Sequence, residues 1–423
     1  MIDLKIDNFL TKNMPPSSLE IAKKIVEKLR KQGYVAYFAG GWVRDYIMDH
    51  PSDDIDIATN ATVKEVEELF EKTIPVGVQF GIIIVVEKNH HFEIASFRKE
   101  EGYKDGRRPT HITYANAKED AKRRDFTING MFYDPVNKKI LDYVEGQEDI
   151  RKGLVRAIGN PHERFLEDRL RMIRAVRYAS RFHFQIETKT LKAILDHAGA
   201  LFPAVAKERI WHEFLKMANY KHFDLALITL HKLNLLPVIF PSLKEVDINA
   251  IEQRVCYIEQ FPKQAPVIAK ILELFPGSLL EEKKGLCNML KLSNDEHRFV
   301  EFYHSAQNVL LFEVDQEKEL FQWAHFYAHP FYSVCFNICA LRIPEGNNEK
   351  QVHRKREQLL SWAIEKIKRK SPFLSSDALR KEGIGNGIKM GQLLKEGEKI
   401  AINQHLKSEE SIINILKKHP LWT

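Results

Sequence analysis

Paired glycines and paired aspartates are the residues of this sequence best suited to chemistry on phosphates. Gly40 and Gly41 follow an apolar run that predicts a buried strand, and the next residues have helical spacing. Such a turn lets backbone N–H groups approach an anion closely. Asp54 and Asp56 alternate with isoleucines, which predicts a second strand with both carboxylates on one face. The pattern indicates metal-dependent chemistry on a nucleoside triphosphate.

A third acid is often needed beside such a pair, and Glu93 is the best candidate. Glu93 lies on a strand expected at 91–97. The alternative interpretation, that Glu93 is simply an exposed acid on a strand and binds no ligand, fits the sequence about as well. For Asp54 and Asp56 the alternative is an acidic, solvated loop, but their alternation with isoleucine beside the glycine turn favours the metal site.

A basic segment follows further along the chain, where Arg123, Arg124 and Asp125 precede Phe126 and an expected apolar helix. Two arginines and an acid at this position would suit contacts with the ribose and the phosphates of a nucleotide. A helix cap by Asp125 is an alternative that is compatible with this role.

A second polar set lies on a helix expected at 163–182. Its members are three residues apart and form one stripe: Asp168, Arg171, Arg174 and Arg177. A basic stripe is usually a solvated face. An acid and an arginine one turn apart can also match the hydrogen-bonding edge of a base, with two arginines behind them.

These residues need a sheet and helices to position them. Up to about residue 145 the pattern mixes strands and helices, and beyond it helical periodicity dominates. We therefore expect an α+β protein, with a small mixed-sheet head followed by an all-helical neck, body and tail. The expected boundaries are 1–145, 146–220, 221–345 and 346–423, with a linker candidate at 344–348.

Composition predicts a cytoplasmic protein. Of its 423 residues 44% are hydrophobic and 29% charged, which is typical of a globular protein. The longest aliphatic run, 82–86, is too short to span a membrane, and residues 1–7 lack the apolar core of a secretory signal. The four cysteines show no metal-binding spacing, so we expect buried thiols.

The charge distribution indicates a polyphosphate partner. Residues 151–181 hold nine Lys or Arg against three acids, whereas the whole chain has a net charge of +6. A second basic cluster runs from 353 to 370. Concentrated positive charge of this kind suits nucleic acid.

Four motifs occur in a fixed order: Gly-Gly-x-Val-Arg-Asp, Asp-x-Asp, Arg-Arg-Asp-Phe-Thr and Glu-Asp-x-x-Arg. In these motifs the chain resembles the class II tRNA nucleotidyltransferase and bacterial poly(A) polymerase family, within the DNA polymerase β-like superfamily. The resemblance covers residues 16 to about 220 and, more weakly, 377–418. Residues 240–370 carry no motif that we can place.

The resemblance implies roles for the head. Gly41 and Arg44 would hold the triphosphate. Asp54 and Asp56 would bind two Mg²⁺ and activate the 3′-hydroxyl of the tRNA acceptor end.

It also implies how the nucleotide is read. Arg124 would contact the nucleotide, with Asp125 near the ribose. Asp168 and Arg171 would act as an amino-acid template for the base, because Asp accepts from the amino group shared by C and A while Arg donates. Two further arginines would continue the stripe towards the phosphates: Arg174 and Arg177.

The expected function is template-independent addition of C, C and A to the tRNA 3′ end from CTP and ATP, with release of pyrophosphate. A Phe-Gly pair at 80–81 and a short loop at 103–109 resemble the CCA-adding form, and no basic C-terminal extension follows. Gly130 and Ile82 depart from the family pattern at positions without a catalytic role. Poly(A) addition is the main alternative and CC-only addition a lesser one. Two alternatives come from other classes of protein. A nucleotidyltransferase for small molecules would not need the basic helices, and a non-catalytic RNA-binding protein would not need the four motifs intact. The sequence does not indicate the oligomeric state.

Overall fold

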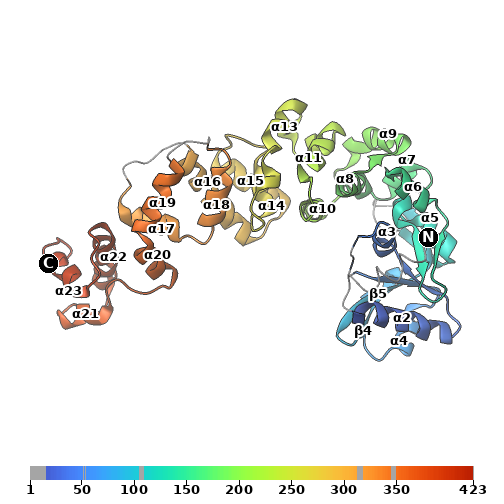
Figure 1. Ribbon diagram of the computed structural model, residues 1–423, viewed down its shortest axis with the longest axis horizontal. Coiled ribbons are helices and arrows are strands. Elements are labelled where there is room, and N and C mark those ends of the chain that lie inside the picture. The colour runs from blue at the N-terminus through green and yellow to red at the C-terminus, as the bar shows by residue number, and fades with distance from the viewer. Residues whose placement is uncertain are drawn as a thin grey trace. The chain divides into compact units, whose positions relative to one another are not determined.

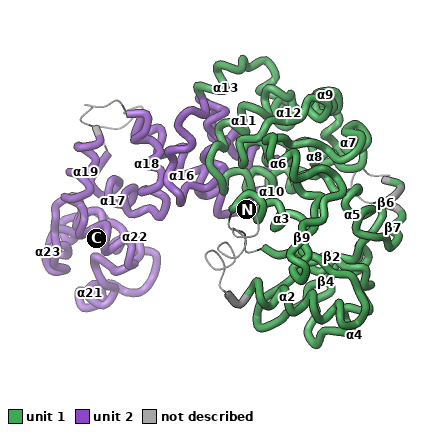
Figure 2. Tube along the Cα trace, turned by 45° about the vertical axis from the view of Figure 1, so that its right-hand side comes forward, with its two compact units in different colours: residues 1–253 green, residues 254–423 purple. Residues whose placement is uncertain are grey.

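The computed structural model describes residues 16–50, 52, 54–103, 109–311, 318–343 and 349–422. The chain forms two compact units, Met1–Gln253 and Arg254–Thr423, which Figure 2 shows in different colours. The finer division into four parts stays a prediction. The segment 1–7, the loop residues 104–108 and the linker candidate 344–348 lie outside the described residues.

Unit 1 contains a seven-stranded mixed sheet in the order β3-β4-β5-β2-β1-β8-β9. Neighbouring strands are antiparallel except β2 and β5, which are parallel. This sheet confirms the expected head. Its strands are β1 (Ala36–Ala39), β2 (Asp56–Thr59), β3 (Thr73–Gly77), β4 (Ile82–Glu87), β5 (His90–Ser96), β8 (Met131–Asp134) and β9 (Lys139–Asp142).

Alternation along the central strands gives the sheet two apolar faces. Phe38 and Ile57 belong to the larger core, which also receives side chains from α2 (Pro16–Lys31), α3 (Gly41–Ile47) and α4 (Val63–Leu69). Figure 1 shows α2 and α4 close to β4 and β5. Ala39 and Ala58 point the other way, into a smaller core with α5 (Ala117–Arg123). Because successive side chains of a strand point to opposite faces, β1 and β2 lie between these two cores.

Two short elements near the sheet differ from expectation. Asp54 precedes β2 and does not lie on it. Phe126 is followed by a 3₁₀ turn, η2 (Thr127–Asn129), and then by β8, so the apolar helix expected there is wrong. A hairpin of β6 (Arg98–Tyr103) and β7 (Pro109–Tyr114) adjoins α5. A second 3₁₀ turn precedes β4: η1 (Val78–Phe80).

The rest of unit 1 is mainly helical. The single helix expected at 163–182 is wrong, because the backbone of Asp168 is extended, with φ of −148° and ψ of 105°, and splits it into α7 and α8. One face of α8 is buried, as Ile173 and Val176 show. The elements are α6 (Gly146–Lys152), β10 (Leu154–Val155), α7 (Pro161–Glu167), α8 (Leu170–Phe182), β11 (Gln185–Ile186), α9 (Thr188–His197), η3 (Ala198–Ala200), α10 (Lys207–Ala218), α11 (Phe223–Lys232), α12 (Leu235–Ile239) and η4 (Pro241–Leu243).

The described residues of unit 2 are helical, which confirms the expected helical body. Aromatic side chains such as Trp323, Tyr327 and Tyr332 pack in its interior. Helix α13 (Ile248–Val255) crosses the boundary between the units. The following elements are η5 (Ile258–Gln260), α14 (Val267–Leu272), α15 (Leu280–Leu290), α16 (Asn294–Leu311), α17 (Leu320–Ala328), α18 (Tyr332–Ala340), α19 (Glu349–Leu359), α20 (Ser361–Lys368), α21 (Ser376–Lys381), α22 (Ile388–Asn403) and α23 (Glu409–Leu416).

The structure bears on two expectations from composition, the lack of a membrane span and the burial of the cysteines. No helix among the described residues is both long and apolar enough to cross a membrane. Cys287, Cys335 and Cys339 are buried, whereas Cys256 is exposed, so the expectation of a buried thiol is wrong for Cys256.

Candidate active site

A pocket of about 840 Å³ in unit 1 brings most of the predicted site residues together. Its walls come from the glycine turn, from strands β1, β2, β4, β5 and β6, and from helices α5, α8 and α10. Only Arg44 among the predicted residues is not part of the pocket wall. The predicted residues that line it are Gly41, Asp54, Asp56, Glu93, Arg124, Asp125, Asp168, Arg171, Arg174 and Arg177.

The glycine turn lets two of the predicted site side chains approach the backbone. Gly40 has φ of 69° and ψ of −132°, a conformation that side chains disfavour. A Cβ atom on Gly40 would lie 3.2 Å from Nη1 of Arg124 and 3.4 Å from Oδ2 of Asp56. The strand, two-glycine turn and helix start expected from the sequence are therefore present, and glycine is required for close packing at the turn.

Pairing of the central strands brings the acids together. Asp56 begins β2, which runs parallel to β5. Ile57 of β2 pairs with Ile94 of β5, so Asp56 and Glu93, each one residue earlier, lie on neighbouring strands at the same level. Asp54 lies two residues before Asp56 and is exposed. The three carboxylates line one pocket although Glu93 is distant in sequence.

Crowding of these carboxylates changes their acidity. Burial raises the pKa of Asp56 to about 7, with further contributions from the charges of Glu93 and Asp54. Burial and the charge of Asp54 also raise the pKa of Glu93. Carboxylate oxygens are preferred ligands of hard divalent cations, and a cation would relieve this repulsion. The acids thus fit a divalent metal, although within the described ranges no three His, Cys, Asp or Glu side chains already converge as a metal-binding cluster.

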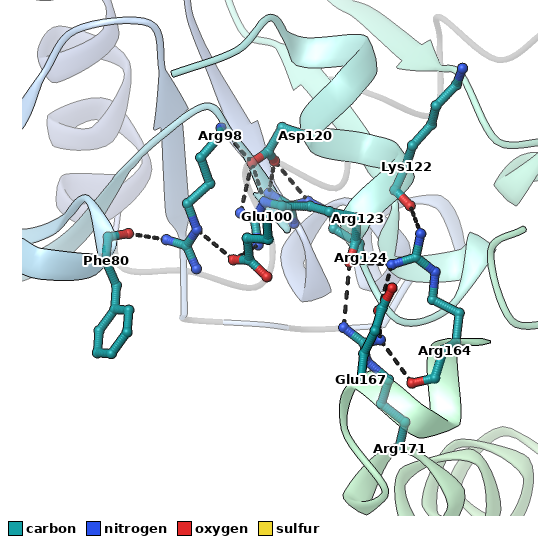
Figure 3. Close-up of polar contacts among 10 residues, drawn as sticks. All are labelled: Phe80, Arg98, Glu100, Asp120, Lys122, Arg123, Arg124, Arg164, Glu167 and Arg171. Carbon is teal, nitrogen blue, oxygen red and sulfur yellow. Dashed lines mark hydrogen bonds and ion pairs between the residues drawn. The ribbon is translucent and has the colours of Figure 1, made fainter. Parts of the chain in front are cut away.

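A buried carboxylate orients the arginines at the end of α5, as Figure 3 shows. Asp120 is 1% exposed. It accepts hydrogen bonds from Nε of Arg123 at 2.8 Å and from Nε and Nη2 of Arg124 at 3.2 and 3.1 Å. Burial opposes ionisation of Asp120, but the charges of Arg124 and Arg123 outweigh it and lower its pKa. Arg124 is therefore held rigidly beside the glycine turn.

A second carboxylate connects the hairpin to the same helix (Figure 3). Glu100 of β6 accepts from Nε of Arg98 at 2.6 Å and from Nη1 of Arg123 at 3.0 Å. Arg98 also donates to the carbonyl oxygen of Phe80. The hairpin, α5 and the turn before β4 thus share one network of ion pairs.

Asp125 and Arg174 form a pair at the floor of the pocket. Oδ2 of Asp125 accepts from Nε and Nη2 of Arg174 at 2.9 and 2.5 Å, and Oδ1 accepts from Asn129 at 3.1 Å. Burial alone would raise the pKa of Asp125, but Arg174 and the Asn129 hydrogen bond lower it well below its usual range. Asp125 is therefore an ionised acceptor, held by α8.

Asp168 lies in the break between α7 and α8. Its carboxylate accepts from Nη1 and Nη2 of Arg209 on α10 at 3.2 and 2.8 Å, and from the N–H of Leu170 at 3.1 Å. The expected stripe along one helix is therefore wrong at its first member. Asp168 precedes the helix, whereas Arg171, Arg174 and Arg177 lie on α8.

Arg171 connects three segments (Figure 3). Its Nη1 donates to Glu167 at 2.5 Å and to the carbonyl oxygen of Arg164 at 3.0 Å. Its Nη2 lies 3.5 Å from the carbonyl oxygen of Arg123. The side chain is thus fixed between α5, α7 and α8, beside the pocket.

Two further arginines differ in their access to the pocket. Nε of Arg177 donates to Glu213 of α10 at 2.6 Å, and Arg177 lines the pocket. Arg44 is only 2% exposed. It donates to Asp45 at 2.7 and 2.9 Å and to Asn129 at 2.5 Å. Arg44 therefore lies behind the glycine turn, and direct contact with a triphosphate stays a prediction.

Several residues of the pocket were missed from the sequence. Arg98 and Glu100 lie on β6, which was not expected as a strand. Three others lie at the end of α10: Lys216 is in its last turn, and Asn219 and Tyr220 follow the helix. Their spacing of three and four residues was the available signal.

A mixed sheet with paired carboxylates beside a glycine turn, faced by helices that carry arginines, defines a nucleotidyltransferase. Residues 36–156 match the family described as Poly A polymerase head domain, and residues 183–246 match the probable RNA and SrmB-binding site of polymerase A. The chain is 40% identical over 271 residues to the CCA-adding enzyme of Staphylococcus saprophyticus, covering 57% of this chain and 67% of that one. It is 43% identical over 203 residues to the CCA-adding enzyme of Enterococcus faecalis, covering 48% and 50%.

Solved structures share the fold over nearly the whole chain. The CCA-adding enzyme of Bacillus stearothermophilus in complex with CTP has a TM-score of 0.76 at 24% identity, covering 96% of this chain and 98% of that one. The Thermotoga maritima CCA-adding enzyme complexed with tRNA_CCA has a TM-score of 0.66 at 18% identity, covering 98% of both.

The chain belongs to the class II family of CCA-adding tRNA nucleotidyltransferases and bacterial poly(A) polymerases, as the sequence motifs predicted. Its alignments span between half and two thirds of the length of these curated relatives. Nucleotidyltransferases of this family typically need a divalent metal.

Proposed function

We propose that the protein adds C, C and A to the 3′ end of tRNA from CTP and ATP, with release of pyrophosphate. The observation that carries this proposal is one pocket that holds both the acids beside the glycine turn and the Asp168–Arg171 pair. The first set suits transfer of a nucleotide, and the second suits selection of its base. The similar proteins described as CCA-adding enzymes support this choice over poly(A) addition. Because tRNA and nucleotides are the substrates, we expect the reaction in the cytoplasm.

The metal of this reaction is proposed to be Mg²⁺, held by Asp54 and Asp56 with Glu93 as a candidate third ligand. When bound, Mg²⁺ lowers the pKa of an attacking hydroxyl and neutralises charge on the leaving oxygens. Asp56 must be ionised to serve as a ligand, and its pKa of about 7 makes that ionisation dependent on pH.

Selection of the base is assigned to Asp168 and Arg171. An Asp oxygen can accept from the amino group shared by C and A, while Arg supplies donors. U and G present the opposite pattern and would leave polar groups unpaired, so they are rejected. Arg209 and Glu167 hold the two side chains in place from either side.

Ribose and phosphate contacts are assigned to the remaining residues. Ionised Asp125 can accept from a ribose hydroxyl, and Arg124 stands beside it at the glycine turn. Gly41 is assigned to the triphosphate. Within 4 Å its added Cβ atom would meet only the guanidinium of Arg44, which supports the turn from behind. Arg174 and Arg177 extend positive charge along α8.

The test is incubation with tRNA that lacks its 3′ CCA, using CTP, ATP or both. We expect two C residues with CTP alone and CCA with both nucleotides. Asp54→Ala and Asp56→Ala should abolish transfer but keep tRNA binding. A long A tail would establish poly(A) addition instead.

A further inference from the structure

Most polar residues on one face of α10 pair with residues on α8 or just before it. Polar residues recur every three or four positions along this face and just past the end of the helix: Arg209, Glu213, Lys216 and Tyr220. Arg209 pairs with Asp168 at 2.8 Å, and Glu213 pairs with Arg177 at 2.6 Å. The Tyr220 ring lies 4.1 Å from the guanidinium of Arg181. Three of the four residues thus have a partner on α8 or immediately before it.

Lys216 is the exception. It is exposed, lines the pocket, and has no ion-pair or hydrogen-bond partner in the part of the chain that the structure describes. By contrast, every arginine described in the pocket wall has a carboxylate partner: Arg98, Arg123, Arg124, Arg171, Arg174 and Arg177. A cation left unpaired on the wall of a polar pocket indicates an anionic ligand.

The surroundings of Lys216 are positive. Glu213, one turn before it, pairs with Arg177. Tyr220, four residues after it and past the end of α10, packs on Arg181. Arg181 pairs with Asp45 at 3.1 Å, and the same carboxylate also holds Arg44 at 2.7 Å. With Lys216 itself included, these charged groups comprise four cations and two carboxylates. The carboxylates proposed to hold metal, in contrast, lie on the sheet side of the pocket.

We propose that Lys216 binds the terminal phosphates of the incoming nucleoside triphosphate, with the Asn219 side chain beside it. This inference rests on the proposed function, because the base is placed at Asp168 and Arg171. From Arg171 to Arg177 the α8 axis advances by about 9 Å, towards the level of Lys216. The triphosphate therefore extends along α8 to a lysine ammonium, which is a compact charge with three donors for phosphate oxygens.

The test compares binding of CTP and CMP, with Mg²⁺ and without RNA, by titration calorimetry. Lys216→Met should weaken binding of CTP and ATP roughly ten- to a hundredfold, which is the usual effect of losing a charged hydrogen bond. CMP lacks the terminal phosphates, so its affinity should not change. Lys216→Arg should retain most of the CTP affinity. Lys192→Met, an exposed lysine of α9 outside the pocket, is the matched control.

Two results would overturn the assignment. One is unchanged CTP affinity in Lys216→Met, and the other is an equal loss for CTP and CMP. If only the KM for tRNA rises, the phosphate belongs to the RNA backbone and the triphosphate assignment fails. A failure of the proposed function looks different: the wild-type protein would not extend tRNA lacking CCA, whereas the contrast between CTP and CMP would remain.

Discussion

Among single residues, Asp56 has the clearest dependence on pH. Its pKa is about 7 in the folded protein, against an ordinary value of 3.8. Between these values the folded state keeps a proton that the unfolded state has lost, so stability falls as the pH rises. We expect Asp56→Asn to remove this loss and to stabilise the metal-free protein at pH 8 by at most about 4 kcal/mol.

Urea unfolding in EDTA between pH 4 and pH 8 measures this difference. Addition of Mg²⁺ at pH 8 should stabilise the wild-type protein and have little effect on Asp56→Asn. If both proteins show the same pH dependence, the pKa of Asp56 is not raised.

Arg171 allows a test of base selection. Arg171→Ala should raise incorporation of U and G relative to C and A by roughly tenfold or more, because the donors matched to C and A are lost. Arg164 still pairs with Glu167 at 2.8 Å, so the local fold should survive. Primer extension with single nucleotides measures selectivity, with Arg151→Ala, whose side chain is 73% exposed, as the control. Unchanged selectivity would disprove the assignment.

At the scale of elements, the contact between α6 and η2 positions the pocket floor. A Cβ atom on Gly146 would lie 2.3 Å from the carbonyl oxygen of Thr127. That turn also carries Asn129, which bonds Asp125 and Arg44. Gly146→Ala should therefore destabilise the protein by roughly 1–3 kcal/mol through overpacking and lower kcat.

Thermal unfolding checks this prediction. Gly285→Ala on α15 is the control, because nothing lies within 4 Å of its added Cβ atom. This control should be neutral or more stable by up to about 1 kcal/mol, since alanine favours helix. Equal stability of Gly146→Ala and the wild-type protein would show that η2 can move freely.

For the whole molecule, the two units are expected to share tRNA binding through charge. The affinity for tRNA should fall steeply as salt rises, because binding releases counterions from the phosphates. Lys355 and Lys368 of unit 2 are exposed. If each contacts one phosphate, Lys355→Gln with Lys368→Gln should reduce the slope of log K against log salt by about 2.

Filter binding across a salt series measures the slope, and CTP binding without RNA serves as the internal control. The double variant should bind CTP like the wild-type protein. An unchanged slope would remove these lysines from the RNA contact.

Local patterns were enough to predict much of this protein. The strand, glycine pair and helix at the glycine turn follow from short-range propensity, and so does the change from a mixed head to helices. The pairing of Asp54 with Asp56 was visible because the residues are two apart. The ordered motifs then identified the family from the sequence.

Only the tertiary structure decided how the distant parts of the site combine. Asp168 is held by Arg209, 41 residues later, and Glu93 reaches the aspartates through a parallel strand pair. Arg44 proved to be buried, and Lys216 entered the pocket wall, because of packing between helices far apart in sequence. Periodicity tells which face of a helix is polar, but the partner opposite that face depends on long-range packing, which no local pattern contains.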